Sequence, residues 1–451
     1  MRNKSIWLLE EGDEYPRLKG DIVVDVAIAG GGIAGLTAAY MLKKAGLKVA
    51  VVEANKIAEG VSGHTTGKIT SQHDLIYNKL SQKSDIDTAK LYARANQDAI
   101  ERIEQIINQE KIECNFLRQD AYIYTCIKNK KKDIEQEAKA ALNMGIKSEL
   151  TKETGLPFEV ELALRFKNQA MFHPVKYLRS LAKKINGDGS FIFEKSRVTK
   201  VDNALLKTNG GSITADNVII ATHFPIMNTP GLYFVKMYQH RSYLVALEGA
   251  RALDGMYISY EKDGKSFRMF DKYLLVCGAD HKTGKEGSIS HYDMLEEYAK
   301  LTFPGANIFT EWSAQDCLSP DIIPYIGRYS SKTPKIYVAT GFAKWGMTGG
   351  TVAGIILSDM ILERENEFEE IFSPQREKTL LTLGNVAVNV SEVTGEYARG
   401  ILKKTPVCTH LKCKLTWNID EKSWDCPCHG SRFNEHGSII EAPAVLNLKT
   451  Q

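Results

Sequence analysis

The stretch DVAIAGGGIAGLTAAYMLKKAGLKVAVVE, residues 25–53, decides the fold of the first half of the chain. A short β-branched run enters a glycine cluster, a segment with helical periodicity follows, and a second apolar run ends at an acidic residue. The predicted strand, helix and strand are Asp25–Ala29, Ile33–Ala45 and Lys48–Val52. The sequence therefore predicts a β-α-β unit with a glycine-rich turn before its helix.

The glycine cluster fits the pattern G-x-G-x-x-G. Gly30 permits the tight turn, Gly32 lets the backbone approach a pyrophosphate, and Gly35 allows the helix to pack closely on the strand. The free N–H groups at the helix N-terminus point at the phosphates. Glu53 is placed to accept hydrogen bonds from a ribose diol, which disfavours NADP. The predicted site is a dinucleotide cradle made of Gly30, Gly32, Ile33, Ala34, Gly35 and Glu53, and the cradle alone does not distinguish NAD from FAD.

Composition limits the class of protein. A chain of 451 residues with 43% hydrophobic and 25% charged residues predicts two or three globular domains. The net charge of +3 and the lack of a basic stripe with interleaved aromatics predict no nucleic-acid partner. The start of the chain has no long apolar run, and the other apolar stretches are too short or too rich in glycine to cross a bilayer. We therefore expect a cytoplasmic protein without a membrane span.

A cluster of cysteines and histidines near the C-terminus indicates a metal centre. Cys408 and His410 form C-x-H, and Cys426 and His429 form C-x-x-H, with fifteen residues between the two halves. Two thiolates on one iron and two imidazoles on the other are the ligands of a Rieske [2Fe-2S] cluster. A Cys₂His₂ zinc site is the alternative, but zinc fingers favour a cysteine pair followed by a histidine pair. The division of one cysteine and one histidine in each half favours the Rieske cluster.

Two segments identify the expected dinucleotide. GVSGHTTGKITSQH (residues 60–73) and ATGFAKWGMTGGTVAGIILSDMI (residues 339–361) resemble the flavin-contacting segments of the D-amino-acid-oxidase-like family, the glycine and sarcosine oxidase group. The resemblance extends over roughly residues 20–370 and implies FAD. By position it implies that the flavin is lined by Ser62, Thr65, Thr66, Gly67, Lys68, Gly341, Phe342, Gly346, Met347 and Thr348, and that the backbone of Val198 meets the adenine. Some relatives attach the flavin covalently through a histidine in the loop that holds His64, but we expect noncovalent FAD.

The C-terminal segment resembles Rieske proteins of the cytochrome bc type. The resemblance lies in CTHLKCKLTWN (residues 408–418) and SWDCPCHGSRF (residues 423–433). It implies a disulfide between Cys413 and Cys428, a hydrogen bond from Ser431 to a cluster sulfide, and a covering loop at Pro443. The base of this module looks shortened, because Asn385–Ile401 has the pattern of a helical linker rather than of strands.

The rest of the chain completes the predicted architecture. The fold class is α/β for a Rossmann-like FAD-binding domain, α+β with an antiparallel sheet for a substrate domain, and all-β for a small Rieske module. The predicted FAD domain is discontinuous (20–80, 170–235 and 325–372), the substrate domain comprises 81–169 and 236–324, the linker is 373–400, and the Rieske module is 401–451. A glycine-rich loop at 344–350 is expected to precede a helix from Thr351 to Glu363, and His173 is expected to cap a helix.

The combination resembles bacterial FAD-dependent oxidoreductases with a C-terminal Rieske domain. A flavin takes two electrons together as a hydride, whereas a [2Fe-2S] cluster passes one at a time. We expect dehydrogenation of a small amine or amino-acid-like substrate at the flavin, with electrons leaving through the cluster to a redox partner protein or another acceptor. The reverse direction is equally sensible. The alternatives are an electron relay with no organic substrate, and an O₂-using flavin enzyme whose Rieske module is only a structural lid.

Catalytic residues are the least determined part. The resemblance implies a dry pocket with a cation that anchors the substrate carboxylate. The candidates are His240, Arg241 and Tyr243 on the segment QHRSYL, together with Lys344 beside the segment GMT. The alternative for each of them is an ordinary polar residue on a solvated strand face.

Overall fold

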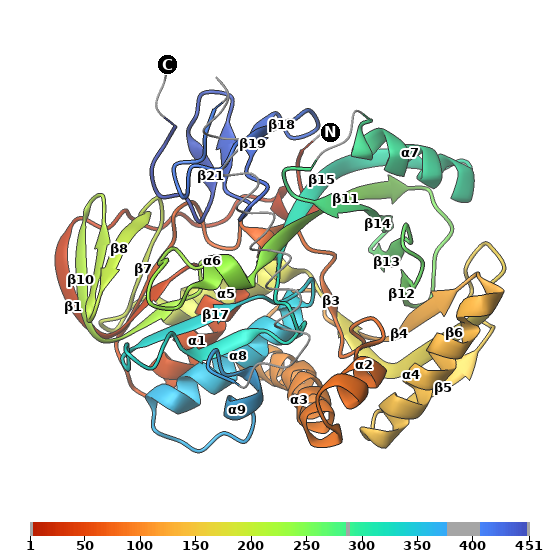
Figure 1. The fold of residues 1–451 in the computed structure, drawn as a ribbon, viewed down its shortest axis with the longest axis horizontal. Coiled ribbons are helices and arrows are strands. Elements are labelled where there is room, and N and C mark those ends of the chain that lie inside the picture. Colours follow the sequence, from red (N-terminus) through yellow and green to blue (C-terminus); the bar gives the residue numbers. More distant parts are fainter. Residues whose placement is uncertain (1–2, 286–288, 377–405, 449–451) are drawn as a thin grey trace.

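The computed structural model describes residues 3–285, 289–376 and 406–448, which form two large sheets with their helices and a smaller C-terminal sheet (Figure 1). In the first sheet β1 pairs in parallel with β10 and β2, β10 with β17, and β2 with β7. β16 is antiparallel to β17, and β8 and β9 form a hairpin beside β10. The strands are β1 (Gly20–Ala29), β2 (Val49–Val52), β7 (Phe191–Phe193), β8 (Val198–Asp202), β9 (Leu205–Thr208), β10 (Gly211–Ile220), β16 (Tyr325–Arg328) and β17 (Ile336–Thr340).

Alternate residues of β1 and β2 enter different cores, as the period of two in a strand requires. Val26 and Ile28 pack into the large core with the helices, whereas Ala27 and Ala29 pack into the core on the other face of the sheet. The helices of the first region are α1 (Ile33–Lys44), α5 (Pro174–Ile185), α8 (Gly346–Ile361) and the short α6 (Tyr233–Lys236) and α9 (Glu369–Phe372). The predicted β-α-β unit is therefore present as β1, α1 and β2.

Helix α8 begins at Gly346 rather than at the predicted Thr351, so the expected glycine-rich loop is shorter than predicted. A Cβ atom at Gly350 would lie 2.6 Å from Ile33 Cγ2, and one at Gly354 would lie 2.5 Å from Thr37 Cγ2. These glycines serve close packing of α8 on α1 instead of breaking the helix. The sequence pattern alone favoured a loop, because glycine disfavours helices where packing does not require it.

The second sheet follows the order β15-β11-β14-β13-β12-β4-β6-β3, with β5 beside β6. Its strands are β3 (Lys68–Ile69), β4 (Leu117–Thr125), β5 (Ser148–Thr151), β6 (Leu162–Met171), β11 (Tyr238–Glu248), β12 (Met256–Ser259), β13 (Ser266–Phe270), β14 (Tyr273–Lys282) and β15 (Asn307–Leu318). The accompanying helices are α2 (Ile76–Lys83), α3 (Ile86–Glu110), α4 (Lys131–Asn143) and α7 (His291–Thr302), with 3-10 turns at η1 (Ile6–Leu8), η2 (Val61–Gly63) and η3 (Lys128–Lys130). His173 caps α5 as predicted, because its Nδ1 accepts from the N–H of Lys176 at 3.2 Å.

The C-terminal module is an antiparallel sheet in the order β18-β19-β20-β21. Its strands are β18 (Thr416–Asn418), β19 (Ser423–Asp425), β20 (Arg432–Asn434) and β21 (Ile439–Glu441). Its small core contains the four cysteines together with Leu415, Phe433 and Ala444. Figure 1 shows the module above the ends of β11 and β15, beside the N-terminus. The predicted helical linker Asn385–Ile401 lies outside the described residues.

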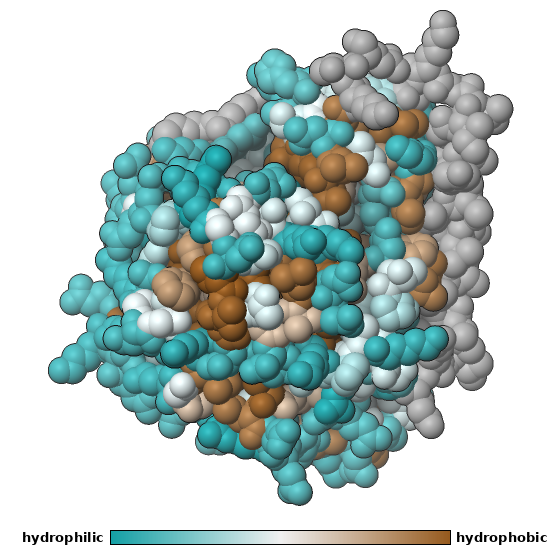
Figure 2. Space-filling model, turned by 90° about the vertical axis from the view of Figure 1, so that its left-hand side faces the viewer, coloured by the Kyte–Doolittle hydropathy of each residue, from teal (hydrophilic) through white to brown (hydrophobic). Residues whose placement is uncertain are grey.

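Figure 2 shows one face of the molecule, on which apolar residues gather in patches between hydrophilic ones. No helix in the described ranges combines the length and the hydropathy that crossing a bilayer requires.

Candidate functional site

The glycine cradle at the end of β1 has one position, Gly32, where an added Cβ would meet only a single side-chain hydroxyl. Gly30 has φ +112° and its Cβ would meet Ala221 O at 2.3 Å, and a Cβ at Gly35 would meet Gly30 O at 2.1 Å. These two glycines are therefore required by the backbone itself. A Cβ at Gly32 would meet only Ser62 Oγ, at 3.2 Å. Gly32 is thus the position where the cradle leaves room for a ligand.

A long cavity extends from this cradle past the ends of the parallel strands. Many of the predicted cofactor residues line it: Gly30, Gly32, Ile33, Ala34, Glu53, Ser62, Thr65, Val198, Phe342, Gly346 and Met347. Thr66, Lys68 and Thr348 line a neighbouring cavity instead. Gly35, Gly67 and Gly341 are absent from both linings; the last two have φ +71° and +76°, which permits the turns beside the cavities.

Polar groups hold both ends of the cradle. Glu53 accepts from the N–H groups of Gly31 and Asn55, each at 2.8 Å, and burial raises the pKa of its carboxyl. Ser62 Oγ accepts from the N–H of Ile33 at 3.1 Å, at the N-terminus of α1. This end of the helix therefore presents N–H groups and partial positive charge, as an anionic pyrophosphate requires.

Hydrogen bonds from a buried arginine hold the loop at residues 64–70 in place. Arg268 Nη1 donates to Gly67 O at 2.7 Å and to Phe172 O at 3.2 Å. Burial lowers the pKa of Arg268 to about 9. His73 connects the loop to α8, because its Nε2 lies 2.7 Å from Thr70 O and 3.2 Å from Thr348 Oγ1. The two segments that the sequence singled out are thus bound to each other.

The neighbouring cavity, which we call the substrate cavity, has a volume of about 630 Å³. It lies between the second sheet, the loop at residues 61–73 and the start of α8. Its size suits a small organic ligand. The two cavities meet at residues that line both, namely Val61, Thr65, Asp316, Lys344 and Met347.

Charged side chains surround this junction. Lys344 pairs with Asp280, and although burial opposes its charge, Asp280 and Asp316 raise the pKa of Lys344 above its usual range. Burial raises the pKa of Asp316. On the opposite wall Lys68 Nζ donates to Tyr257 O at 2.6 Å and to Ser266 Oγ. Burial lowers the pKa of Lys68 to about 7.

The candidates on β11 are divided between the two faces of the strand. Ser242 and Leu244 line the substrate cavity, but Arg241 and Tyr243 do not. Arg241 is 1% exposed and bonds to Ser313 and Gln315 beneath the C-terminal module. The expectation that Arg241 and Tyr243 face the substrate is therefore wrong. The pattern of β11 could not show this, because both faces of the strand are covered.

His240 and Tyr243 do not line the substrate cavity, although Lys344 and Asp280 of its lining lie near His240. The ring of Tyr243 stacks on His291 with centroids 4.9 Å apart, and its hydroxyl lies 3.2 Å from His281 Nε2. Burial lowers the pKa of His240 to about 4, so its imidazole is neutral at pH 7. Of the four catalytic candidates proposed from the sequence, only Lys344 lines the substrate cavity.

The predicted iron ligands converge in the C-terminal module. Cys408, Cys426 and His429 are fully buried, and the rings of His410 and His429 lie with centroids 5.0 Å apart. The Nδ1 atoms of both histidines are buried and have no hydrogen-bond partner within the described residues. A hydrogen bond from Cys426 lowers the pKa of the Cys408 thiol to about 7.

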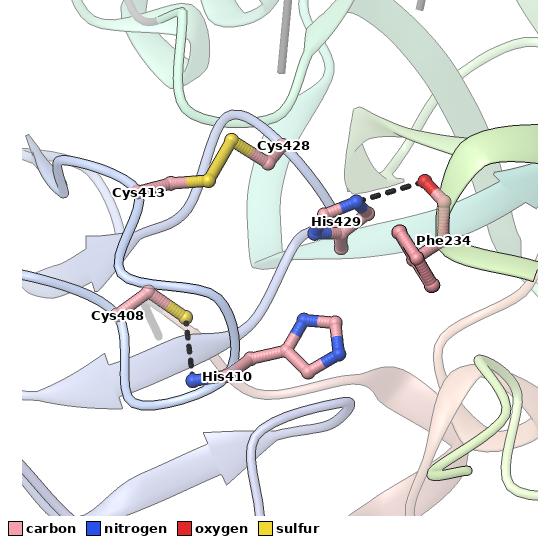
Figure 3. The surroundings of a disulfide bond; sticks show 6 residues. All are labelled: Phe234, Cys408, His410, Cys413, Cys428 and His429. Carbon is pink, nitrogen blue, oxygen red and sulfur yellow. Dashed lines mark hydrogen bonds between the residues drawn. A yellow bond between two sulfur atoms is a disulfide. The ribbon is translucent and has the colours of Figure 1, made fainter. Parts of the chain in front are cut away.

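The hydrogen bonds of the two histidine Nε2 atoms show which ring nitrogen is free to bind a metal. His429 Nε2 donates to Phe234 O at 2.8 Å (Figure 3). His410 Nε2 lies 2.5 Å from Asn228 Oδ1. Because oxygen acceptors hold the proton on Nε2, the lone pair remains on Nδ1 in each ring. Two thiols and two free Nδ1 atoms fit a [2Fe-2S] cluster of the Rieske type.

The other two cysteines of the C-terminal module form a disulfide. Cys413 and Cys428 are bonded to each other, as Figure 3 shows. Their sulfurs lie with Cys426 Sγ in a group whose members are all within 4.8 Å of one another. The disulfide removes Cys413 and Cys428 from metal ligation, which leaves the predicted ligand set. Ser431 bonds to the Cys408 thiol and also accepts from Ala444 N–H at 3.0 Å.

Comparison with known proteins agrees with this geometry. The family model "FAD dependent oxidoreductase" matches residues 25–360, and the model "Rieske [2Fe-2S] domain" matches residues 389–451. The chain belongs to the FAD-dependent oxidoreductase family. It carries a C-terminal Rieske domain, and its cofactors are FAD and a [2Fe-2S] cluster. The predicted fold class and both predicted cofactors are thereby confirmed.

Some similar proteins match nearly the whole chain, and others match the FAD-binding part. A Bacillus subtilis protein named "Putative Rieske 2Fe-2S iron-sulfur protein YhfW" is 36% identical over 96% of this chain and 94% of its own length. Glycine oxidase from Geobacillus kaustophilus superposes with a TM-score of 0.68 at 19% identity, covering 79% of this chain and 99% of that one. L-proline dehydrogenase from P. horikoshii superposes with a TM-score of 0.65 at 19% identity, covering 80% of this chain and 97% of that one. The solved structures show the fold of the FAD-binding part.

Several residues at the two cavities were missed from the sequence. Asp316 lies at the junction, Asp280 lines the substrate cavity, and Arg197 lies beside Glu53. The cavity at the glycine cradle, which we call the FAD cavity, is also lined by residues of the Rieske module, namely Ile440, Glu441, Ala442, Ala444 and Val445. Strand alternation could have found Asp316, because it lies two residues from Ala314 on the same face of β15. No pattern in the sequence indicates that the Rieske segment contacts the FAD cavity.

Proposed function

We propose that the protein dehydrogenates a small amine or amino-acid-like substrate at FAD and passes the electrons through the Rieske cluster to a separate acceptor. The observation that carries the proposal is the junction of the substrate cavity with the FAD cavity. The structural neighbours named for glycine and L-proline support the substrate class. A cytoplasmic location remains a prediction.

The chemistry needs few protein groups. When bound, FAD supplies a hydride acceptor and the cluster supplies a one-electron carrier. Dehydrogenation breaks the C–H bond beside the nitrogen, delivers its electron pair with the hydrogen to the flavin, and releases one proton from the nitrogen to leave an imine. Asp316 lies at the cavity junction with its pKa raised by burial, so its carboxylate is suited to receive that proton.

We assign to Lys68 the role of a cation that binds a substrate carboxylate, a role for which Arg241 was one of the sequence candidates. Its Nζ lies in the wall of the substrate cavity with a carbonyl and a hydroxyl as partners. In the described part of the chain no carboxylate pairs with it. A buried cation without a counter-charge is costly, and a bound carboxylate relieves that cost.

We expect Lys68→Met to weaken binding of a carboxylate-bearing substrate by about 10- to 100-fold, the loss that one charge-assisted hydrogen bond represents. Lys68 carries its charge below its pKa of about 7 and loses it above. In the wild type kcat/KM for such a substrate should therefore fall as the pH rises through 7. Lys68→Met should abolish this step in the pH profile.

Lys272→Met is the matched control for Lys68. Lys272 is exposed in the turn between β13 and β14, pairs with Glu248 at 2.6 Å and does not line the cavity. Its replacement should change neither KM nor the pH profile. An unchanged pH step in Lys68→Met would remove Lys68 from the site.

Anaerobic mixing tests the function itself. Each of a panel of amines and amino acids is added to the purified protein while flavin absorbance and the Rieske EPR signal are followed. We expect one substrate class to bleach the flavin and then to raise the EPR signal of the reduced cluster. Bleaching by a reductase protein alone would favour the relay. Flavin bleaching with a cluster that stays oxidised would favour the O₂-using enzyme with a structural lid.

A further inference from the structure

The Rieske module and the FAD-binding part share a wall of the FAD cavity. Alongside the cradle residues, the cavity is lined by five residues of the C-terminal module: Ile440, Glu441, Ala442, Ala444 and Val445. These residues come from β21 and the loop that follows it. We propose that the Rieske module forms part of the FAD-binding site and is held there by Arg241, so that FAD affinity depends on side chains of the iron–sulfur module.

Arg241 is the centre of a buried charge network between the two parts. Its Nη2 lies 3.5 Å from Asp425 Oδ2 and donates to Gln315 Oε1 at 2.7 Å, and its Nη1 lies 3.9 Å from Glu421 Oε2. Asp425 is fully buried and Arg241 is 1% exposed. Charges buried this deeply require partners, and these partners lie on opposite sides of the boundary.

A second arginine carries the network from Arg241 to the FAD cavity. Arg432 bonds to Glu421 at 3.0 Å, to Asp425 at 3.3 Å and to Glu441 at 2.9 Å. Glu441 in turn accepts from Gln315 Nε2 at 2.7 Å and lines the FAD cavity. The network therefore extends without interruption from β11 to the cavity wall.

The loop that carries the histidine ligand is tied to the same strands. Gln239 Nε2 donates to His429 O at 2.7 Å, and Gln315 Nε2 donates to Gly430 O at 2.9 Å. A Cβ at Gly430 would lie 2.7 Å from Gln239 Cδ, so the backbone of the loop approaches β11 as closely as a residue without a side chain allows. The position of the module is thus specified by hydrogen bonds and by close packing.

A separate contact holds the far edge of the module on α7. Asp420 accepts from Ser290 Oγ at 2.6 Å and from His291 N–H at 2.9 Å, and Tyr292 Oη donates to Glu421 at 2.8 Å. Two contact regions on different elements define one docked orientation. A module held in this way serves as a fixed wall, and a side chain added to that wall changes the space available to FAD.

Val445→Trp tests the wall directly. The indole enlarges a side chain that lines the FAD cavity, while the cluster ligands are untouched. Deflavinated protein is titrated with FAD and the quenching of flavin fluorescence is followed. We expect the Kd for FAD to rise at least about tenfold, with iron content and the Rieske EPR signal at wild-type values. Leu446→Trp is the matched control, because the next residue is 66% exposed and lies outside the cavity lining, and its Kd should equal that of the wild type.

Arg241→Met and Arg241→Lys test how the wall is held. The methionine removes the charge that faces Asp425 and Glu421, whereas lysine keeps it. We expect FAD affinity to fall in Arg241→Met and to be partly restored in Arg241→Lys, with two irons per chain in both. Wild-type FAD affinity in Val445→Trp, or in an iron-replete Arg241→Met, would overturn the proposal. If Arg241→Met does not fold, Val445→Trp still decides the question.

Discussion

Replacing Gly32 with valine is expected to abolish FAD binding while the chain still folds. A Cβ at Gly32 would meet only the Ser62 hydroxyl, at 3.2 Å, and it would project into the cavity where we expect the cradle to receive the pyrophosphate. The branched side chain displaces the phosphate from the backbone N–H groups. Loss of two charge-assisted hydrogen bonds corresponds to about 3–6 kcal/mol, which is more than about 100-fold in affinity.

Other substitutions in the cradle separate binding from folding. Gly32→Ala should give an intermediate loss of affinity, because a methyl group occupies less of the phosphate space. Gly30→Ala should instead destabilise the fold, since its Cβ would lie 2.3 Å from Ala221 O at φ +112°. FAD content and thermal unfolding of the purified variants measure the two effects. Full FAD occupancy in Gly32→Val would mean that the pyrophosphate lies elsewhere.

Cys408→Ser is expected to eliminate the cluster. A Rieske centre has only two thiolate ligands, so the loss of one leaves an iron without half of its protein ligands. Iron should fall from about two per chain to background, and the EPR signal of the reduced protein should vanish. Substrate should still bleach the flavin if FAD remains bound, whereas transfer to a one-electron acceptor should fall by orders of magnitude.

Cys126→Ser is the control, because Cys126 is a free and exposed cysteine outside the module. It should keep its iron and its activity. Retention of two irons in Cys408→Ser would contradict the ligand assignment. Stoichiometric zinc without iron in the wild type would support the Cys₂His₂ zinc site that the sequence left as the alternative.

The two cofactor sites were predictable because their decisive residues are close together in the sequence. The cradle lies within residues 25–53, and the four iron ligands lie within residues 408–429. Both sites depend on local backbone geometry or on ligand chemistry, which short patterns record. The substrate cavity is different, since it is assembled from η2, α8 and strands that lie far apart in the chain.

The error at β11 has the same origin. Alternation along the strand predicts two faces, but it does not say which face meets the substrate and which meets another part of the protein. Ser242 faces the cavity, whereas Arg241 faces Asp425 of the Rieske module. In the sequence, a buried arginine that pairs with a carboxylate across an interface cannot be distinguished from one that binds a substrate.

By itself the sequence determined the β-α-β cradle and the C-x-H and C-x-x-H pattern of the iron ligands, and its resemblance to known families implied FAD and the disulfide partners. Only the tertiary structure shows that Arg241 pairs with Asp425 of the Rieske module, that Lys68 and Asp316 line the substrate cavity, and that residues of β21 and the following loop line the FAD cavity. The physical reason is that ligand type and turn geometry are properties of neighbouring residues. Burial, in contrast, depends on what covers each face, and here the covering residues lie far away along the chain, as Asp425 does from Arg241 and Val445 from Gly30.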